Sequence, residues 1–116
     1  MDFSALYQQK HPRFLDFISS IKNKPNARAK VSGIAGSSRS AICSAFFKEI
    51  NTSCVFLLNE YEDAAYFASD LLNYFEEDSI VFFPSSYRRP GHSIQEDASH
   101  IIRRTEALKR LTLSAD

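Results

Sequence analysis

Apolar side chains recur at the spacing of an α-helix in four segments of the chain, and this spacing predicts four helices. The first covers residues 12–23 and opens with Pro12, which suits the first turn of a helix. The second covers residues 39–50. The third begins at Asn59 and the fourth follows Ser93, and in both a Glu three residues later completes the pattern of a capping box.

Three short segments between these helices are typical of buried β-strands. Residues 54–58 and 80–83 are continuous apolar runs, as expected of strands that are covered on both faces. Residues 27–32 are a weaker candidate, because only Val31 has a high β-propensity. Strands that alternate with helices predict an α/β fold, a parallel sheet flanked by helices in three layers. Three strands are few for such a sheet, so we expect a truncated domain that exposes a strand edge or apolar surface and self-associates.

Composition and charge fit an ordinary globular protein of the cell interior. The chain has 116 residues and a net charge of zero, which gives no argument for binding nucleic acid or a membrane surface. Acidic residues predominate in residues 49–78 and basic residues in residues 88–110, and solvated helix faces explain both clusters. The polar start of the chain lacks a signal-peptide pattern, and no apolar run is long enough to span a bilayer. We therefore expect a cytoplasmic protein without a metal site, in which Cys43 and Cys54 are free thiols.

The loop between the first predicted strand and the second predicted helix carries the strongest chemical signal. Residues 33–40 read GIAGSSRS, which can be compared with the Walker A pattern GxxxxGK[S/T] of phosphate-binding loops. Gly33 stands at the first glycine and Ser40 at the closing hydroxyl, but Ser38 replaces the second glycine and Arg39 replaces the lysine. The Ser38 side chain occupies space that the phosphates need, and the planar Arg39 is a poor substitute for the compact charge of lysine.

This departure from the pattern predicts a degenerate phosphate loop that no longer supports hydrolysis, and we assign no catalytic residue. The residues of this loop are Gly33, Gly36, Ser37, Ser38, Arg39 and Ser40. Two alternatives stay open. One is an ordinary turn in which Ser37 or Ser38 caps the helix. The other is a site that holds a phosphate or sulfate weakly through exposed N–H groups and Arg39.

The order of several motifs resembles the N-terminal region of the bacterial transcription-repair coupling factors. These motifs are VSGIAGSSRS (31–40), VFLL (55–58), EDAA (62–65), DL (70–71), VFFPSSYRR (81–89), QEDAS (95–99) and RTEAL (104–108). The resemblance covers residues 27–111, and its specificity lies in the order and spacing of the motifs. The related damage-recognition protein UvrB has a similar order with an intact phosphate loop.

The resemblance implies the first half of a UvrB-like, RecA-type domain over residues 27–116, preceded by a helix and linker over residues 1–26. It implies a non-catalytic scaffold and interaction domain that serves transcription-coupled nucleotide excision repair. The full-length proteins are ATP-dependent DNA translocases, which use ATP and magnesium in other domains, displace stalled RNA polymerase and recruit UvrA. UvrA, RNA polymerase and DNA are thus expected to be contacted by other parts of the parent chain. This part should need no cofactor and should contact neighbouring domains, and the UvrA-contacting residues should lie beyond Asp116.

Two other functions also stay open. An active nucleotide-binding domain with unusual loop residues would depend on Arg39. A small DNA-binding module would use the C-terminal basic residues Arg88, Arg89, Arg103, Arg104, Lys109 and Arg110. Those on the last predicted helix are explained more simply as its solvated face, opposite an apolar face made by residues 98, 101, 102, 105 and 108.

The connection after the third predicted strand is a further candidate contact region. Tyr87, Arg88 and Arg89 are candidates for contact with a phosphate backbone or with a neighbouring domain. The connection is too short for the DNA-clamping hairpin of UvrB, and an exposed loop is the simpler interpretation.

Overall fold

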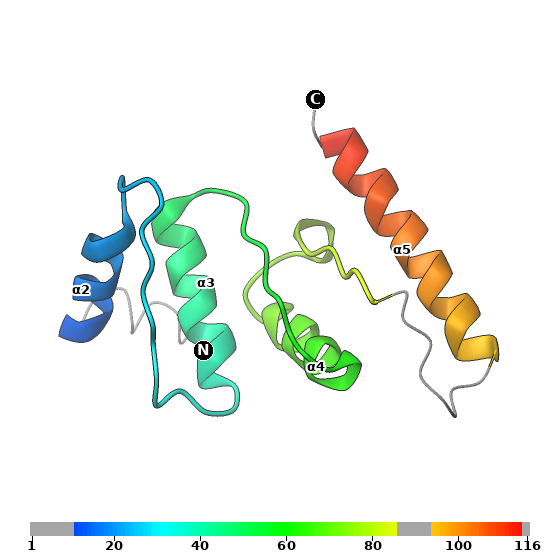
Figure 1. The fold of residues 1–116 in the computed structure, drawn as a ribbon, viewed down its shortest axis with the longest axis horizontal. Coiled ribbons are helices and arrows are strands. Elements are labelled where there is room, and N and C mark those ends of the chain that lie inside the picture. Colours follow the sequence, from blue (N-terminus) through cyan, green and yellow to red (C-terminus); the bar gives the residue numbers. More distant parts are fainter. Residues whose placement is uncertain (1–10, 86–93, 115–116) are drawn as a thin grey trace.

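The computed structural model describes residues 11–85 and 94–114, and every regular element within these ranges is helical (Figure 1). Helices α2 (Pro12–Ile21), α3 (Ser38–Ile50) and α4 (Tyr61–Leu71) follow one another, with α3 between the other two. A short 3₁₀ helix, η1 (Glu77–Ser79), precedes the long helix α5 (Ile94–Ser114), which lies beyond α4 at the edge of the molecule. The four helices predicted from the spacing of apolar residues are therefore all present.

The predicted α/β fold is wrong, because the described residues contain no strand and no sheet. Residues 54–58 and 80–83 do run as non-helical segments, but no backbone hydrogen bond joins either of them to another strand among the residues described. Val55 and Leu57 are 87% and 93% exposed, so the apolar run at 54–58 is not a buried central strand. A partial RecA-like sheet is thus not supported by the part of the chain that the structure describes.

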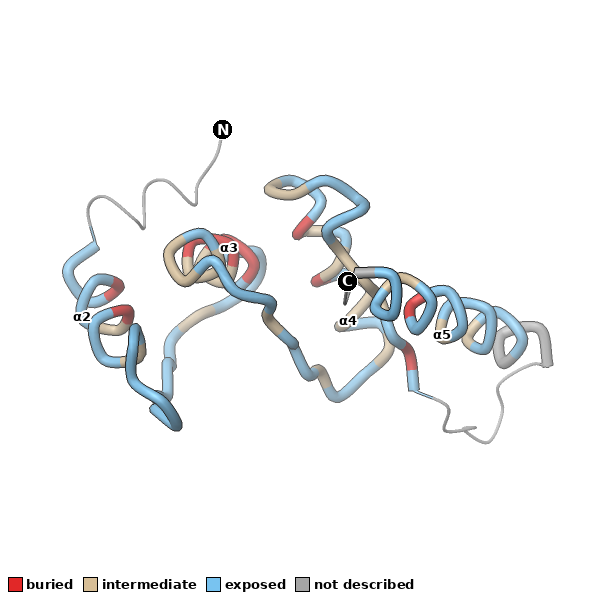
Figure 2. Tube along the Cα trace, turned by 90° about the horizontal axis from the view of Figure 1, so that it is seen from above, coloured by how far each residue is buried: buried red, intermediate tan, exposed pale blue. Residues whose placement is uncertain are grey.

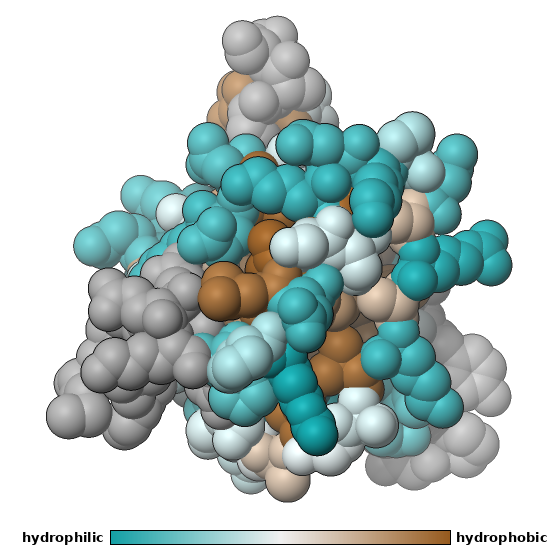
Figure 3. All heavy atoms as spheres, turned by 90° about the vertical axis from the view of Figure 1, so that its left-hand side faces the viewer, coloured by the Kyte–Doolittle hydropathy of each residue, from teal (hydrophilic) through white to brown (hydrophobic). Residues whose placement is uncertain are grey.

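The best-defined core lies between α2 and α3. Phe14 and Ile18 of α2 are buried against Ala45 of α3, and Phe17, Ile42 and Phe46 pack around them. The rings of Phe17 and Phe46 lie 5.4 Å apart between centroids, a normal distance for a packed aromatic pair. Seen from the α2 side, apolar atoms lie between polar side chains on the surface (Figure 3).

Small side chains line the buried face of α3 that meets α4. Ser40, Ala41 and Ser44 of α3 are buried, as are Phe67 and Leu71 of α4, and the two helices are in contact. The Ser44 hydroxyl donates to the Ser40 carbonyl at 2.7 Å, which satisfies a polar group that would otherwise be costly to bury. The contacts that join α3 to α4 include Ser40 with Asp70 and Arg39 with the Phe67 ring.

Helix α4 begins at Tyr61, and its N-cap lies one residue later than the capping-box pattern predicts. Its N-cap residue is Glu60, without a side-chain capping bond, so Asn59 does not cap the helix. The acidic side chains of Glu62 and Asp63 in its first turn stabilise the N-terminus of the helix, because they interact favourably with the positive end of the helix dipole. The corresponding prediction at Ser93 lies outside the described residues.

Helix α5 packs through its basic face, which is the reverse of the prediction. The Arg104 guanidinium donates to the Pro84 carbonyl at 2.9 Å and lies over the Phe83 ring. Arg110 donates to the Ile80 carbonyl at 2.9 Å and also to the carbonyls of Glu77 and Asp78. Figure 2 shows the rest of α5 mostly exposed around one buried position, Ala107.

Candidate functional site

The loop before α3 takes its shape from two glycines with positive φ angles. Gly33 has φ 78° and Gly36 has φ 56°, a region that glycine enters without the steric cost of a Cβ atom. A Cβ atom at either position would meet no heavy atom within 4 Å. These glycines are therefore required by the turn itself, and not by the close approach of another group within the molecule.

The N-terminal turn of α3 uses most of its own N–H donors. The amides of Ser38 and Arg39 donate to the carbonyls of Ala35 and Gly36, both at 3.3 Å. The amide of Ala41 donates to the Ser37 carbonyl at 3.2 Å. A phosphate-binding helix terminus leaves such donors directed at its ligand. Here, three of the first four amides of α3 are already paired with the loop.

Ser37 is the N-cap residue of α3, as one of the open alternatives expected, but its side chain makes no capping hydrogen bond. Ser38 is the first residue of the helix, and its side chain is exposed. The helix therefore starts at the turn made by Ala35 and Gly36, without help from a serine hydroxyl.

The Ser40 hydroxyl, which aligns with the magnesium-binding hydroxyl of a working phosphate loop, is turned into the protein. Ser40 is only 1% exposed, and its Oγ donates to the Ser37 carbonyl at 2.8 Å. The same Oγ lies 3.4 Å from Oδ2 of Asp70 on α4. A hydroxyl has one proton to donate, so the shorter bond to the Ser37 carbonyl takes it. Ser40 therefore serves the local structure of the loop.

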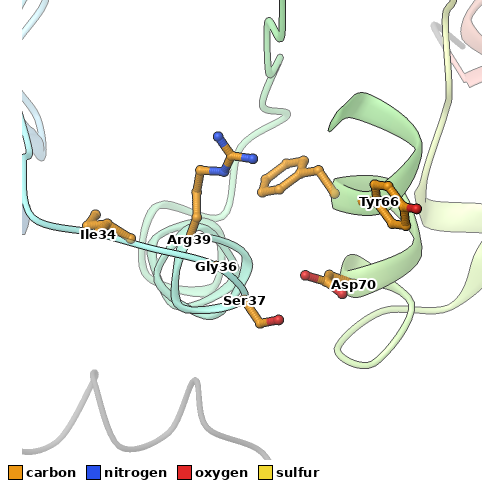
Figure 4. Close-up of a pocket in the computed structure, with 7 residues that line it drawn as sticks. Ile34, Gly36, Ser37, Arg39, Tyr66 and Asp70 are labelled. Atoms are coloured by element: carbon orange, nitrogen blue, oxygen red, sulfur yellow. The ribbon is translucent and has the colours of Figure 1, made fainter. Parts of the chain in front are cut away.

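Arg39 is directed away from the loop, toward α4. Its guanidinium carbon lies 5.4 Å from the centroid of the Phe67 ring, which places it in cation–π range (Figure 4). The Asp70 carboxylate points toward the loop in the same view. A negative carboxylate facing the loop repels a phosphate group that would bind there.

An open pocket of about 380 Å³ lies between the loop and α4. Its lining residues are Ile34, Gly36, Ser37, Arg39, Tyr66, Phe67 and Asp70. Of the six predicted loop residues, Gly36, Ser37 and Arg39 line it. Gly33 and Ser38 do not line it, and Ser40 lies buried behind it. Tyr87, Arg88 and Arg89 lie outside the described residues.

Asp70 and Phe67 are the important members that sequence reasoning missed. Both lie on α4, about thirty residues after the loop. From the sequence, Asp70 is noted only as part of the DL motif (70–71) of the family resemblance. Their helical spacing of three residues places them on one face of α4. The spacing alone does not tell that this face meets the loop.

The two cysteines are free and half-buried, as predicted for thiols without a disulfide. Burial raises the pKa of the Cys43 thiol, although the nearby Arg39 charge opposes that rise. Burial also raises the pKa of Cys54. A raised pKa keeps both thiols protonated at neutral pH, so neither is an activated nucleophile.

A second hollow, of about 290 Å³, lies where α4, residues 80–85 and α5 come together. His100 stacks on Tyr61 with ring centroids 4.5 Å apart, and Phe82 meets Tyr61 edge-on at 5.6 Å. These rings pack on one another, so their contacts join α4 to α5.

Neither a metal centre nor a membrane segment is found in the part of the chain that the structure describes. Within residues 11–85 and 94–114, no three His, Cys, Asp or Glu side chains come together as a set of metal ligands. None of the helices described there has both the length and the apolar character needed to cross a bilayer.

Comparison with known proteins gives no assignment. No family model matches the chain, and neither the curated proteins nor the solved structures contain a significant match to it. Function is therefore inferred from the residues of the chain and from the geometry of the loop.

Proposed function

We propose that this chain is a non-catalytic interaction module of the transcription-coupled repair machinery. It would act in the cytoplasm as part of a transcription-repair coupling factor, the family that its motif order resembles. The proposal does not include the RecA-like sheet, which the fold excludes. ATP, magnesium, UvrA, RNA polymerase and DNA would be bound by other parts of the parent protein.

The observation that carries this proposal is the state of the loop before α3. The cation that would meet a nucleotide lies over Phe67, and the hydroxyl that would meet magnesium donates to the Ser37 carbonyl. Asp70 adds a negative charge on the side where phosphates would lie. A nucleotide would have to break these contacts and overcome the repulsion, so the loop is better suited to joining α3 to α4 than to binding ATP.

The basic residues on α5 also favour an interaction module over a DNA-binding one. Arg104 and Arg110 donate to backbone carbonyls, and Arg103 lies over the Phe82 ring. Arginines held in this way have fewer donors left for phosphate oxygens. DNA binding through this face would also have to detach α5 from residues 77–84.

Calorimetric titration with ATP and with ADP, in the presence of magnesium, tests the non-catalytic part of the proposal. At protein concentrations that detect affinities of about 1 mM, we expect no heat of binding. Saturable binding that Arg39→Ala abolishes would overturn the proposal. Arg28→Ala is the matched control, because Arg28 is an exposed arginine outside the loop.

The role in repair needs a separate test in cells that encode this chain. Deletion of residues 27–111 from the parent protein should slow removal of lesions from the transcribed strand but not from the opposite strand. Arg39→Ala should leave both rates unchanged, because the loop performs no chemistry. Equal strand-specific repair with and without residues 27–111 would exclude the role in repair.

A further inference from the structure

Helix α5 presents an apolar stripe to solvent on the side opposite Arg103, Ala107 and Arg110, and Arg104 borders the stripe. The stripe consists of Ala98, Ile101, Ile102, Thr105, Leu108 and Thr112. Ile101, Ile102 and Leu108 are 63%, 66% and 54% exposed, whereas the opposite side of the helix contains the buried Ala107. Among the α5 residues whose burial is described, Ala107 alone is buried, and the apolar stripe is left exposed.

The spacing along this stripe is that of a two-helix seam. Positions 98, 101, 105, 108 and 112 alternate steps of three and four residues, the a and d positions of a heptad repeat. Small residues take the a positions, namely Ala98, Thr105 and Thr112, and the larger Ile101 and Leu108 take the d positions. Ile102 lies at the edge of the seam.

The two threonines do not add a polar cost to covering this seam. The Thr105 hydroxyl donates to the Ile101 carbonyl at 2.9 Å, and the Thr112 hydroxyl donates to the Leu108 carbonyl at 2.8 Å. Both hydroxyls are therefore satisfied inside the helix and need no water. The seam can become dry without leaving either hydroxyl unpaired.

We propose that two copies of this chain associate through the α5 seam, with the two helices antiparallel. In this arrangement Ala98 meets Leu108 of the second copy, and Ile101 meets Thr105 of the second copy. Each contact then pairs a small residue with a large one, and the twofold axis repeats it. A parallel pair would instead stack small on small and large on large, which leaves gaps at the alanine and threonine layers.

The size matching favours a second copy over a membrane surface as the occupant. Helices that lie on membranes use free Lys and Arg on the polar face to meet lipid headgroups. On α5, Arg104 and Arg110 are bonded to carbonyls of the same chain and Arg103 lies over the Phe82 ring, which leaves Lys109 as the exposed cation without such a contact among the described residues of this helix. The net charge of zero also means that two copies do not repel one another overall.

The seam is short, so the association should be weak. Residues 98–112 span about 21 Å of helix, and one helix pair of this length buries less than the roughly 800 Å² per partner of a standard interface. We expect a dissociation constant on the order of 100 μM.

Sedimentation equilibrium of the 116-residue chain from about 10 to 500 μM tests the proposal, with a monomer–dimer equilibrium expected in this range. Ile101→Glu should weaken the dimer by about tenfold or more, because it places an unpaired charge in the seam. Leu72→Glu is the control and should have no effect, since Leu72 is 51% exposed but lies at the end of α4. A strict monomer throughout, or a dimer that Ile101→Glu leaves unchanged, would overturn the proposal. So would binding to anionic vesicles that Ile101→Glu abolishes while the chain in solution stays monomeric.

Cross-linking tests the orientation in a background where Cys43 and Cys54 are replaced by serine. Ile102→Cys lies near the twofold axis of an antiparallel pair, so a short bismaleimide should link two copies. Ala98→Cys lies far from its counterpart in the antiparallel pair and should not be linked. Equal linking at both positions would indicate parallel helices and would contradict the proposed arrangement.

Discussion

Arg110→Ala should detach the C-terminal half of α5 from η1 and the segment that follows it. Its guanidinium donates to the carbonyls of Ile80, Glu77 and Asp78, which makes it the main polar link between α5 and these residues. With alanine at this position, the three carbonyls must be hydrated by water instead. The segment that contains them, η1 and Ile80, is then free to move away from α5.

The size of the effect follows from the exposure of these bonds. A hydrogen bond to a charged group contributes about 1.5–3 kcal/mol when it is well shielded. Only the bond to the Ile80 carbonyl is partly buried, and the other two are exposed, so we discount them for competition with water. We expect a total loss of about 1–2 kcal/mol in the free energy of unfolding, or a fall in Tm of about 4–8 °C for a chain of this size.

Thermal unfolding followed by circular dichroism measures the loss, and hydrogen exchange of the Ile80 amide gives a local readout. That amide donates to the Glu77 carbonyl at 3.1 Å, so it should exchange faster once Arg110 is removed. Lys109→Ala removes the same charge from a neighbouring exposed position and should change Tm little. If Arg110→Ala and Lys109→Ala unfold at the same temperature with the same Ile80 exchange rate, the reasoning about this link is refuted.

Two further predictions concern the core and the thiols. Phe14→Ala should lower the free energy of unfolding by about 3–4 kcal/mol in a urea titration, because it leaves a cavity in the α2–α3 core. Leu15→Ala is the control at an exposed position, and it should lower the free energy of unfolding by less than about 1 kcal/mol. Burial raises the pKa of both cysteines, so an uncharged thiol reagent should react with the folded single-cysteine variants Cys43→Ser and Cys54→Ser at a higher pH than with the same variants in urea. The same shift predicts stability that is full below the pKa of an unfolded thiol, about 8.5, and is lost as pH rises through the folded-state pKa. Equal reactivity profiles in the folded and unfolded states would contradict the burial of these thiols.

The helices could be predicted because their signal is local. Apolar spacing and Pro12 place α2 and α3 within two residues of their observed ends, since each helix closes its hydrogen bonds within its own segment. The predicted strands failed for the opposite reason. A strand needs a hydrogen-bonding partner elsewhere in the chain, and an apolar run such as residues 54–58 contains no information about whether one is present.

The faces of the helices were harder to predict than the helices themselves. On α3 the apolar spacing favoured Ile42, Ala45, Phe46 and Ile50, and Ala45 is indeed buried in the core with Ile42 and Phe46 packed against it. The spacing did not indicate Ser40 and Ser44, which are also buried and whose hydroxyls donate to the Ser37 and Ser40 carbonyls. On α5 the expected core face is exposed, because arginines of the opposite face find carbonyls at residues 77–84 that no local pattern reveals. Long-range polar contacts outweighed the apolar pattern in this helix.

The candidate loop lies between a non-helical segment and α3, but the contacts of its side chains were only partly predictable. The replacement of glycine by Ser38 and of lysine by Arg39 predicted a damaged site from residue chemistry alone. The contact of Arg39 with Phe67 and the approach of Asp70 come from α4, which is distant in sequence. These two contacts depend on how α3 packs against α4. The buried residues of α3 include small ones, and their positions in the sequence do not indicate which helix they will meet.

The bonds from Arg104 and Arg110 end on backbone carbonyls, and this has a consequence for how the sequence can drift. Every residue type has a carbonyl group, so side chains at positions 77, 78 and 80 can be exchanged without removing an acceptor. Arg110 has no such freedom, because a lysine lacks the planar fork with which Arg110 donates to three carbonyls at once. Mutational scanning should therefore find that positions 77, 78 and 80 tolerate substitution, whereas position 110 does not, although the same hydrogen bonds join them.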